Sequence, residues 1–168
     1  RGTLFPYTTL FRSGNEAEAA APSGDAVTML RAPQAPVSLT ELWVDGAAGD
    51  DANDGSASSA LKTLAKALEL QAADPSVTTI HVKGDLALSA TATIPSGVTL
   101  SIAADGAKIS GSGNSIDGIV LASGATLTGE GTLTMTGFKT ALTAQPGSTI
   151  TDGTYVFKNN AGASGSRG

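Results

Sequence analysis

A glycine-centred repeat in the second half of the chain constrains the fold more than any other feature. The pentapeptide SGVTL returns as SGATL and then, more loosely, as PGSTI, and the central glycines Gly97, Gly124 and Gly147 are 27 and 23 residues apart. Between the last two, GIVL from Gly118 aligns with TALT from Thr140, a shift of 22. Short strands and glycine corners that recur at this period predict a solenoid, a coil of stacked repeats.

A solenoid solves the burial problem that such short segments have. Each segment is too short to bury its own apolar face, so stacked coils share one core and lie about 4.8 Å apart, as neighbouring strands do. We expect the alternating threonines to face solvent, where β-branching suits an extended backbone. The predicted inward-facing residues are Leu100, Ile109, Leu127, Leu133, Met135, Ile150 and Val156.

Ahead of the repeat, the sequence predicts a strand, a polar loop, a helix and a second strand. LWV, from Leu42 to Val44, is the first strand, and VTTIHVK is the second, with Ile80 and Val82 on one face and His81 on the other. Between them, ALKTLAKALELQAA carries apolar residues at helical spacing, which predicts a helix over about residues 59–73.

The helix has signals at both ends and one apolar stripe. Ser58 or Ser59 is the expected N-cap, and the Asp74-Pro75 pair is expected to end the helix. The stripe consists of Leu61, Leu64, Ala65 and Leu68.

Three zones differ in composition. Residues 1–13 contain TLFPYTTLFRS, which matches at every position the translation of a common short-read sequencing adapter, so we interpret this zone as an artefact without native structure. Residues 14–40, rich in Ala, Pro, Ser and Glu, predict a disordered linker, although AEAAAPSGDA fits the mature side of a secretory cleavage site equally well. Residues 41–168 are predicted to be the N-terminal part of a truncated β-helix domain. We expect a signal peptide to be missing upstream and further coils downstream.

The bulk composition excludes several classes of partner and cofactor. The net charge of −5 and the pI of about 4.6 argue against nucleic acid, because like charges repel. No apolar run reaches the roughly 18–20 residues that span a bilayer, so no membrane span is expected. The absence of Cys excludes disulfides and thiolate metal sites. We expect a monomer.

The segment LWVDGAAGDDANDGSASSALKTLAKALELQAA, continued by TTIHVKGDLAL, resembles the N-terminal start of bacterial right-handed parallel β-helix proteins of the pectin-lyase-like, cell-surface kind. The resemblance covers about Leu42 to Phe157. It implies an all-β, right-handed parallel β-helix with one capping α-helix that covers the first edge, which would otherwise pair with other strands. It also implies an extracellular, cell-wall or cell-surface location and a role as adhesin or scaffold, with an extracellular glycan or a host surface as partner.

The acidic loop GDDANDG is the one candidate metal site. Its oxygen ligands suit Ca²⁺, but EF-hand spacing would place Ala52 at the third ligand position and Leu61 at the twelfth, which excludes an EF-hand. A turn whose side chains bond their own backbone is the favoured interpretation. The candidate ligands are Asp50, Asp51, Asn53 and Asp54, and no other cofactor is predicted.

Glycoside hydrolysis is weakly supported. GNSIDGI resembles the Asn-x-Asp-Gly of β-helix polygalacturonases but has one residue too many. A hydrolase needs two carboxylates at a defined separation, and the acidic residues of this region are isolated in sequence. Asp117 and Lys139, about one coil apart, predict a surface pair. The isolated acidic residues are Asp105, Asp117, Glu130 and Asp152.

A polyuronate lyase needs a base and cations, and the sequence lacks them. No Arg occurs between Arg31 and Arg167, His81 is expected to face solvent, and Trp43 is expected to pack under the helix rather than on a sugar. We therefore predict a non-catalytic protein with no catalytic residue and with unknown glycan-contact residues. Two alternatives stay open: the N-terminal portion of a polysaccharide lyase or glycoside hydrolase whose catalytic coils lie beyond residue 168, and a purely structural module.

Overall fold

The computed structural model describes residues 39–161, which belong to one compact unit. The interpretation of residues 1–13 and nearly all of the predicted linker lie outside the described residues. Every strand pairing is parallel, and the strands stack as a β-solenoid of about three turns, so the predicted parallel β-helix is confirmed. In chain order the elements are β2 (Glu41–Asp45), α2 (Leu64–Ala73), β3 (Thr79–Ala87), β4 (Ala92–Ile94), β5 (Thr99–Ser110), β6 (Ile119–Leu121), β7 (Thr126–Gly129), β8 (Thr132–Thr136), β9 (Leu142–Ala144), β10 (Thr149–Ile150) and β11 (Thr154–Lys158).

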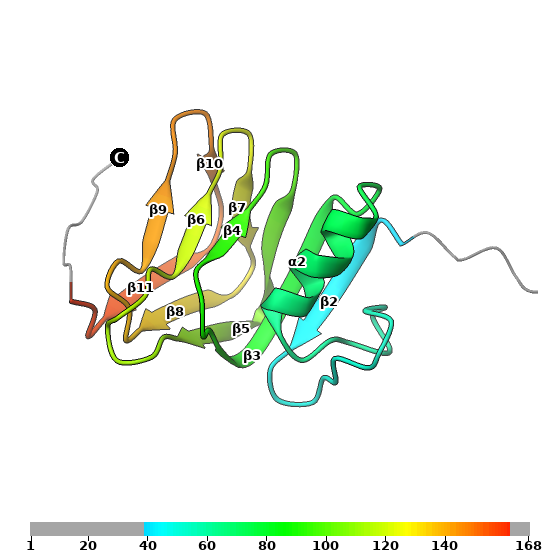
Figure 1. The fold of residues 1–168 in the computed structure, drawn as a ribbon, viewed down its shortest axis with the longest axis horizontal. Helices are drawn as coiled ribbons and strands as arrows, with labels where there is room; N and C mark the ends of the chain where they lie inside the picture. The colour runs from blue at the N-terminus through cyan, green and yellow to red at the C-terminus, as the bar shows by residue number, and fades with distance from the viewer. Residues whose placement is uncertain (1–38, 162–168) are drawn as a thin grey trace, which may run out of the picture. The chain divides into compact units, whose positions relative to one another are not determined.

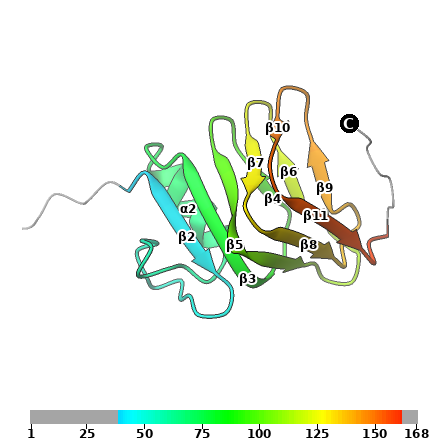
Figure 2. The ribbon, with the colours of Figure 1, turned by 180° about the vertical axis from the view of Figure 1, so that it is seen from behind.

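The strands form two parallel sheets on different sides of the coil (Figures 1 and 2). The larger sheet has seven strands: β2, β3 and β5 follow one another, and β5 then pairs with both β7 and β8. β10 and β11 continue these two branches, while β4, β6 and β9 form the smaller sheet. The coils that contain β4, β6 and β9 contribute strands to both sheets, whereas the coil that begins with β2 has α2 and no strand of the smaller sheet.

The repeat glycines stack directly on one another. Gly97 N–H donates to Gly124 O at 3.0 Å, and Gly124 N–H donates to Gly147 O at 3.0 Å, so the predicted periods of 27 and 23 are confirmed. The shift of 22 predicted for the next segment is wrong, because Ile119 pairs with Leu142. Paired residues are 23 positions apart both between β6 and β9 and between β7 and β10. A shift of 22 occurs between β8 and β11.

The core consists of inward-facing aliphatic side chains. Five of the seven predicted core residues are fully buried, but Ile150 is 43 % exposed because within residues 39–161 no further coil covers β10. Val156 is a wrong prediction, because it lies beside Thr134 and faces outwards. Tyr155 and Phe157 take the inward register instead. A one-residue slip in a strand exchanges its two faces, and only pairing with β8 decides between them.

The helix begins later than the predicted residue 59. Leu61 exchanges backbone hydrogen bonds with β2, where its N–H donates to Trp43 O at 2.8 Å and its C=O accepts from Asp45 N–H at 2.8 Å. This pairing keeps the chain extended, and Thr63 becomes the N-cap in place of Ser58 or Ser59, with its Oγ1 accepting from Lys66 N–H.

The helix ends where the sequence predicts its end. Asp74 is the C-cap, as predicted, and its N–H donates to Leu70 O at 2.9 Å. α2 buries Leu64 and Ala67 and packs against β2, β3 and β4, so Ala65 is exposed rather than part of the buried stripe. α2 has ten residues, and no helix in the described part of the chain is long and apolar enough to cross a membrane.

Two residues that the sequence assigns to the linker contact the solenoid. Leu39 packs against the core, and Thr40 O accepts hydrogen bonds from Thr78 N–H and Thr79 N–H. The outer edge of β2 is also covered, because Gly55 and Leu61 bond to its backbone. The first edge of the solenoid is therefore closed by the chain's own loop as well as by α2.

Candidate functional site

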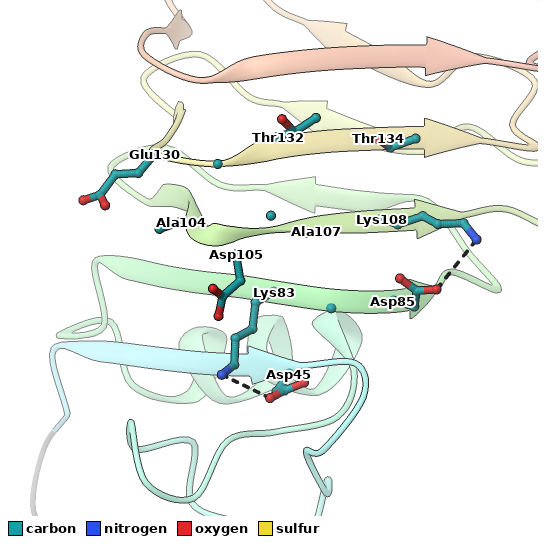
Figure 3. Close-up of a pocket in the computed structure, with 13 residues that line it drawn as sticks. Asp45, Lys83, Asp85, Ala104, Asp105, Ala107, Lys108, Glu130, Thr132 and Thr134 are labelled. Atoms are coloured by element: carbon teal, nitrogen blue, oxygen red, sulfur yellow. Dashed lines mark ion pairs between the residues drawn. The ribbon is translucent and has the colours of Figure 1, made fainter.

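A groove of about 600 Å³ crosses successive coils on the larger sheet (Figure 3). Its lining comes from β2, β3, β5, β8 and the corner between β7 and β8. Because the strands are parallel and in register, one groove collects side chains that lie far apart in the sequence. The charged lining residues are Asp45, Lys83, Asp85, Asp105, Lys108 and Glu130.

A bulge in β5 forms one wall of the groove. Val82 pairs with Ile102, but Gly84 pairs with Ala107, so residues 103–106 stand opposite Lys83 alone. A bulge of this kind bends a strand and re-aims its side chains, and here Asp105 lies at the bulge. The next coil turns at Gly131, where an added Cβ would lie only 2.2 Å from a carbonyl oxygen of the β5 bulge.

The groove carries more negative than positive charge. Lys83 Nζ lies 3.3 Å from Asp45 Oδ2, and Lys108 Nζ lies 3.7 Å from Asp85 Oδ2, so each lysine has its own carboxylate (Figure 3). The other two carboxylates, on Asp105 and Glu130, form no ion pair within residues 39–161. Four carboxylates and two ammonium groups leave the lining at a formal charge of −2.

Asp45 is a fixed anion of the groove. Its Oδ1 accepts hydrogen bonds from Ala48 N–H at 3.0 Å and from Ala47 N–H at 2.9 Å. The bond from Ala48 is the largest influence on its pKa, and together with the bond from Ala47 and the neighbouring Lys83 it outweighs the opposing effect of burial. The pKa of Asp45 is therefore held below its ordinary value, which keeps this carboxylate charged beside Lys83.

The groove is not apparent from the sequence. Asp105 and Glu130 are isolated carboxylates in the sequence, and the coils bring both into the lining of the groove. Asp117 and Asp152 lie outside the groove. The isolation of Asp105 and Glu130 in sequence hid the arrangement, since the contacts depend on coil register. The signal in the sequence is a difference in length. Val82 pairs with Ile102 and Gly84 pairs with Ala107, so the segment IAADGAK has three more residues between its paired positions than the segment HVKGD has.

In the acidic loop, Asp51 ties the loop to the helix. Its Oδ1 accepts from Lys62 N–H at 2.9 Å and Thr63 N–H at 2.8 Å, and its Oδ2 accepts from Thr63 Oγ1 at 2.8 Å. Burial acts to raise the pKa of Asp51, but the hydrogen bonds from Thr63 and Lys62 outweigh it and hold the pKa below 3.8. The carboxylate therefore serves the start of α2.

The other three candidate calcium ligands also bond to the loop itself. Asp50 and Asp54 each accept the backbone N–H two residues further on, at 2.9 Å, and Asn53 Nδ2 donates to Ala60 O at 2.8 Å. In the part of the chain that the structure covers, no group of three or more His, Asp or Glu side chains is arranged to hold a metal. The geometry thus favours the turn interpretation, and calcium binding stays an untested prediction.

Trp43 does not pack under the helix, so that prediction is wrong. It pairs with His81 across β2 and β3, and the two rings stack on the outer face with centroids 4.2 Å apart and an interplanar angle of 18°. Strand alternation explains this, because Leu42 and Val44 already occupy the inner face. His81 faces outwards as predicted, and its Nε2 lies 3.3 Å from Glu41 Oε1.

The segment GNSIDGI contacts the following coil through its backbone. Lys139 N–H donates to Ile116 O at 2.7 Å, yet the predicted ion pair between Lys139 and Asp117 is not among those formed by residues 39–161. Asp117 Oδ1 is buried there without a hydrogen-bond partner in the same region. The sequence shift of 22 suggested a pair, but the coil shift at this position is 23.

In comparisons with protein families, curated proteins and solved structures, none matched the chain. The fold itself supports the coarser part of the resemblance described above, a parallel β-solenoid with a helix near its N-terminal end. Any narrower assignment is therefore a proposal.

Proposed function

We propose that this protein is a non-catalytic bacterial cell-surface or secreted β-helix scaffold that contacts an extracellular glycan through the groove. The observation that carries the proposal is the groove's shape: it crosses successive parallel strands and is lined by carboxylates, ammonium groups and threonine hydroxyls. An extended sugar chain presents hydroxyl groups along its length, and a polar groove across rigid strands offers it repeated hydrogen-bond partners. A cell-surface location fits such a role.

The charged groups of the groove support binding rather than turnover. Each lysine already faces its own aspartate, so a uronate carboxylate would have to compete with that aspartate for the ammonium group. The one histidine stacks on Trp43 and is not among the residues that line the groove. Proton abstraction needs a base within hydrogen-bond reach of the substrate.

The charge of the groove also narrows the ligand class. A lining at −2 repels a polyuronate, and the repulsion weakens with added salt because exposed charges are screened. A neutral or amine-bearing glycan meets no such repulsion. We therefore expect hexose or glucosamine polymers to bind better than galacturonate polymers.

The test is a glycan array probed with the labelled protein, combined with a lyase and hydrolase assay on the same sugars. We expect binding of a neutral or amine-bearing glycan without turnover. The variant Asp105→Ser/Glu130→Gln changes the groove, and Asp152→Ser/Glu69→Gln removes the same charge outside it as a matched control. Absence of any bound glycan, turnover of a sugar, or equal effects of the two double variants would each refute the proposal.

A further inference from the structure

The chain contains the dipeptide Asp-Gly five times, and the fold restrains the aspartate side chain and the glycine backbone to a different extent in each copy. Asp-Gly is the dipeptide most prone to isomerise, because glycine has no side chain to hinder attack by its backbone nitrogen on the aspartate carboxyl carbon. The reaction needs both groups to be free to approach one another. The five copies begin at Asp45, Asp54, Asp105, Asp117 and Asp152.

In three copies the glycine nitrogen is held by a hydrogen bond. Gly46 N–H donates to a carbonyl at 3.0 Å, Gly55 N–H to another at 3.0 Å, and Gly118 N–H to a third at 2.7 Å. In the first two copies the carboxylate is held as well, because Asp45 and Asp54 accept backbone hydrogen bonds within their turns. Reaction at these positions requires these bonds to break first.

The fourth copy, Asp105–Gly106, lies inside β5 at the groove. Within residues 39–161 its carboxylate forms no ion pair, but its glycine backbone lies close to the next coil. An added Cβ on Gly131 would lie 2.7 Å from Gly106 N, and one on Gly106 would lie 2.9 Å from Thr132 O. The close backbone approach opposes the rotation that ring closure needs.

Asp152–Gly153 lacks the hydrogen bonds that hold the carboxylate or the glycine nitrogen in the other turns, and an added Cβ on Gly153 would first meet a side-chain atom, Tyr155 Oη, at 3.0 Å. The Asp152 side chain is exposed, and within residues 39–161 its carboxylate accepts no hydrogen bond and forms no ion pair. Gly153 N–H likewise donates to no backbone carbonyl of that range, and the pair lies in the short corner between β10 and β11. Among the five copies, this one therefore leaves the electrophile and the nucleophile least restrained.

We propose that Asp152 is a site of spontaneous isoaspartate formation in the folded protein. Gly153 N forms a bond to Asp152 Cγ, the hydroxyl group of the carboxylic acid and the amide proton of Gly153 leave together as water, and a five-membered succinimide results. Water then adds to either ring carbonyl, and cleavage on the Cα side routes the main chain through Cβ and Cγ. The two steps lose and regain one water and involve no oxidant or cofactor.

The product changes the last described coil. Isoaspartate adds one methylene to the main chain in the corner that sets the register of β11 on β8. Tyr155 Oη donates to Asp152 O at 2.6 Å and to Thr151 O at 3.0 Å, and these bonds pin the corner to β11. Isomerisation displaces Asp152 O and loosens β11, so Asp152 acts as an ageing site in the last coil that the structure describes.

The test is to incubate the full 168-residue chain at neutral pH over several weeks and to quantify isoaspartate in every Asp-Gly peptide by mass spectrometry. Since each hydrogen bond to be broken lowers the reactive population, we expect roughly tenfold more isoaspartate at Asp152 than at Asp54. In the urea-unfolded chain the restraints vanish, so the ratio between the two sites should fall to near one. Limited proteolysis of the aged chain should cut β11 first.

Two variants sharpen the result. Asp152→Glu keeps the charge but disfavours ring closure, so total isoaspartate should fall, whereas the matched Asp54→Glu should leave it unchanged. Equal accumulation at Asp152 and Asp54 in the folded chain would overturn the proposal. So would a ratio that does not change on unfolding, and both results come from the unmodified sequence.

Discussion

Replacing Asp51 with alanine tests how the first edge of the solenoid is closed. The carboxylate accepts three hydrogen bonds from Lys62 and Thr63, and these join the acidic loop to the start of α2. At about 0.5–1.5 kcal/mol each, three bonds are worth about 1.5–4.5 kcal/mol. Water can reach this half-buried site and replace part of that value, so we expect a loss of about 2 kcal/mol in the free energy of unfolding.

Urea denaturation followed by circular dichroism measures this loss. With a slope of about 2 kcal/mol per molar urea, the midpoint should fall by about 1 M at unchanged slope. Asp50→Ala is the matched control, since Asp50 is the neighbouring loop carboxylate but accepts only one local bond, from Ala52 N–H. It should shift the midpoint much less. Equal shifts for the two variants would refute the assigned role of Asp51.

The same variant has a predicted pH signature. The pKa of Asp51 is lowered in the folded state, so the folded protein holds the charged form more strongly than the unfolded chain does. Its contribution is fully present above the unfolded value of 3.8 and is lost as the pH falls through the lower folded pKa. The difference in stability between wild type and Asp51→Ala should therefore be largest near neutral pH and shrink in acid.

Two further predictions follow from the packing. Gly131→Ala should cost about 2–3 kcal/mol, because its Cβ would meet a backbone carbonyl at 2.2 Å. Gly97→Ala has open space and should cost only the strain of its φ of +82°, about 1 kcal/mol, when both are compared by thermal unfolding. His81→Ala should uncover Trp43, the only tryptophan, and shift its fluorescence to longer wavelength, with an unchanged spectrum counting against the stacked pair.

The sequence predicted the features that depend on local pattern. The glycine corners at Gly97, Gly124 and Gly147 repeat in the chain, and alternation in each strand assigns most inward residues. The helix ends where the sequence places its stop, because Asp74 and Pro75 act locally. The solenoid could therefore be predicted before its contacts were known.

The errors arose where distant strands decide the outcome. Val156 and its neighbours are apolar on both faces of β11, and only pairing with β8 selects Tyr155 and Phe157 as inward. The start of α2 is delayed because Leu61 pairs with β2. The groove depends on a bulge whose length matters only relative to the neighbouring coil, so no single segment reveals it.

The most direct test of the groove as the binding site is an amide chemical-shift map of the protein titrated with a glucosamine oligomer. The account predicts shifts concentrated at the groove backbone, with Gly84, Gly106 and Gly131 as reporters from three successive coils. The outer face around Trp43 should stay unchanged. Shifts centred on the Trp43–His81 stack, with silent groove glycines, would contradict the account.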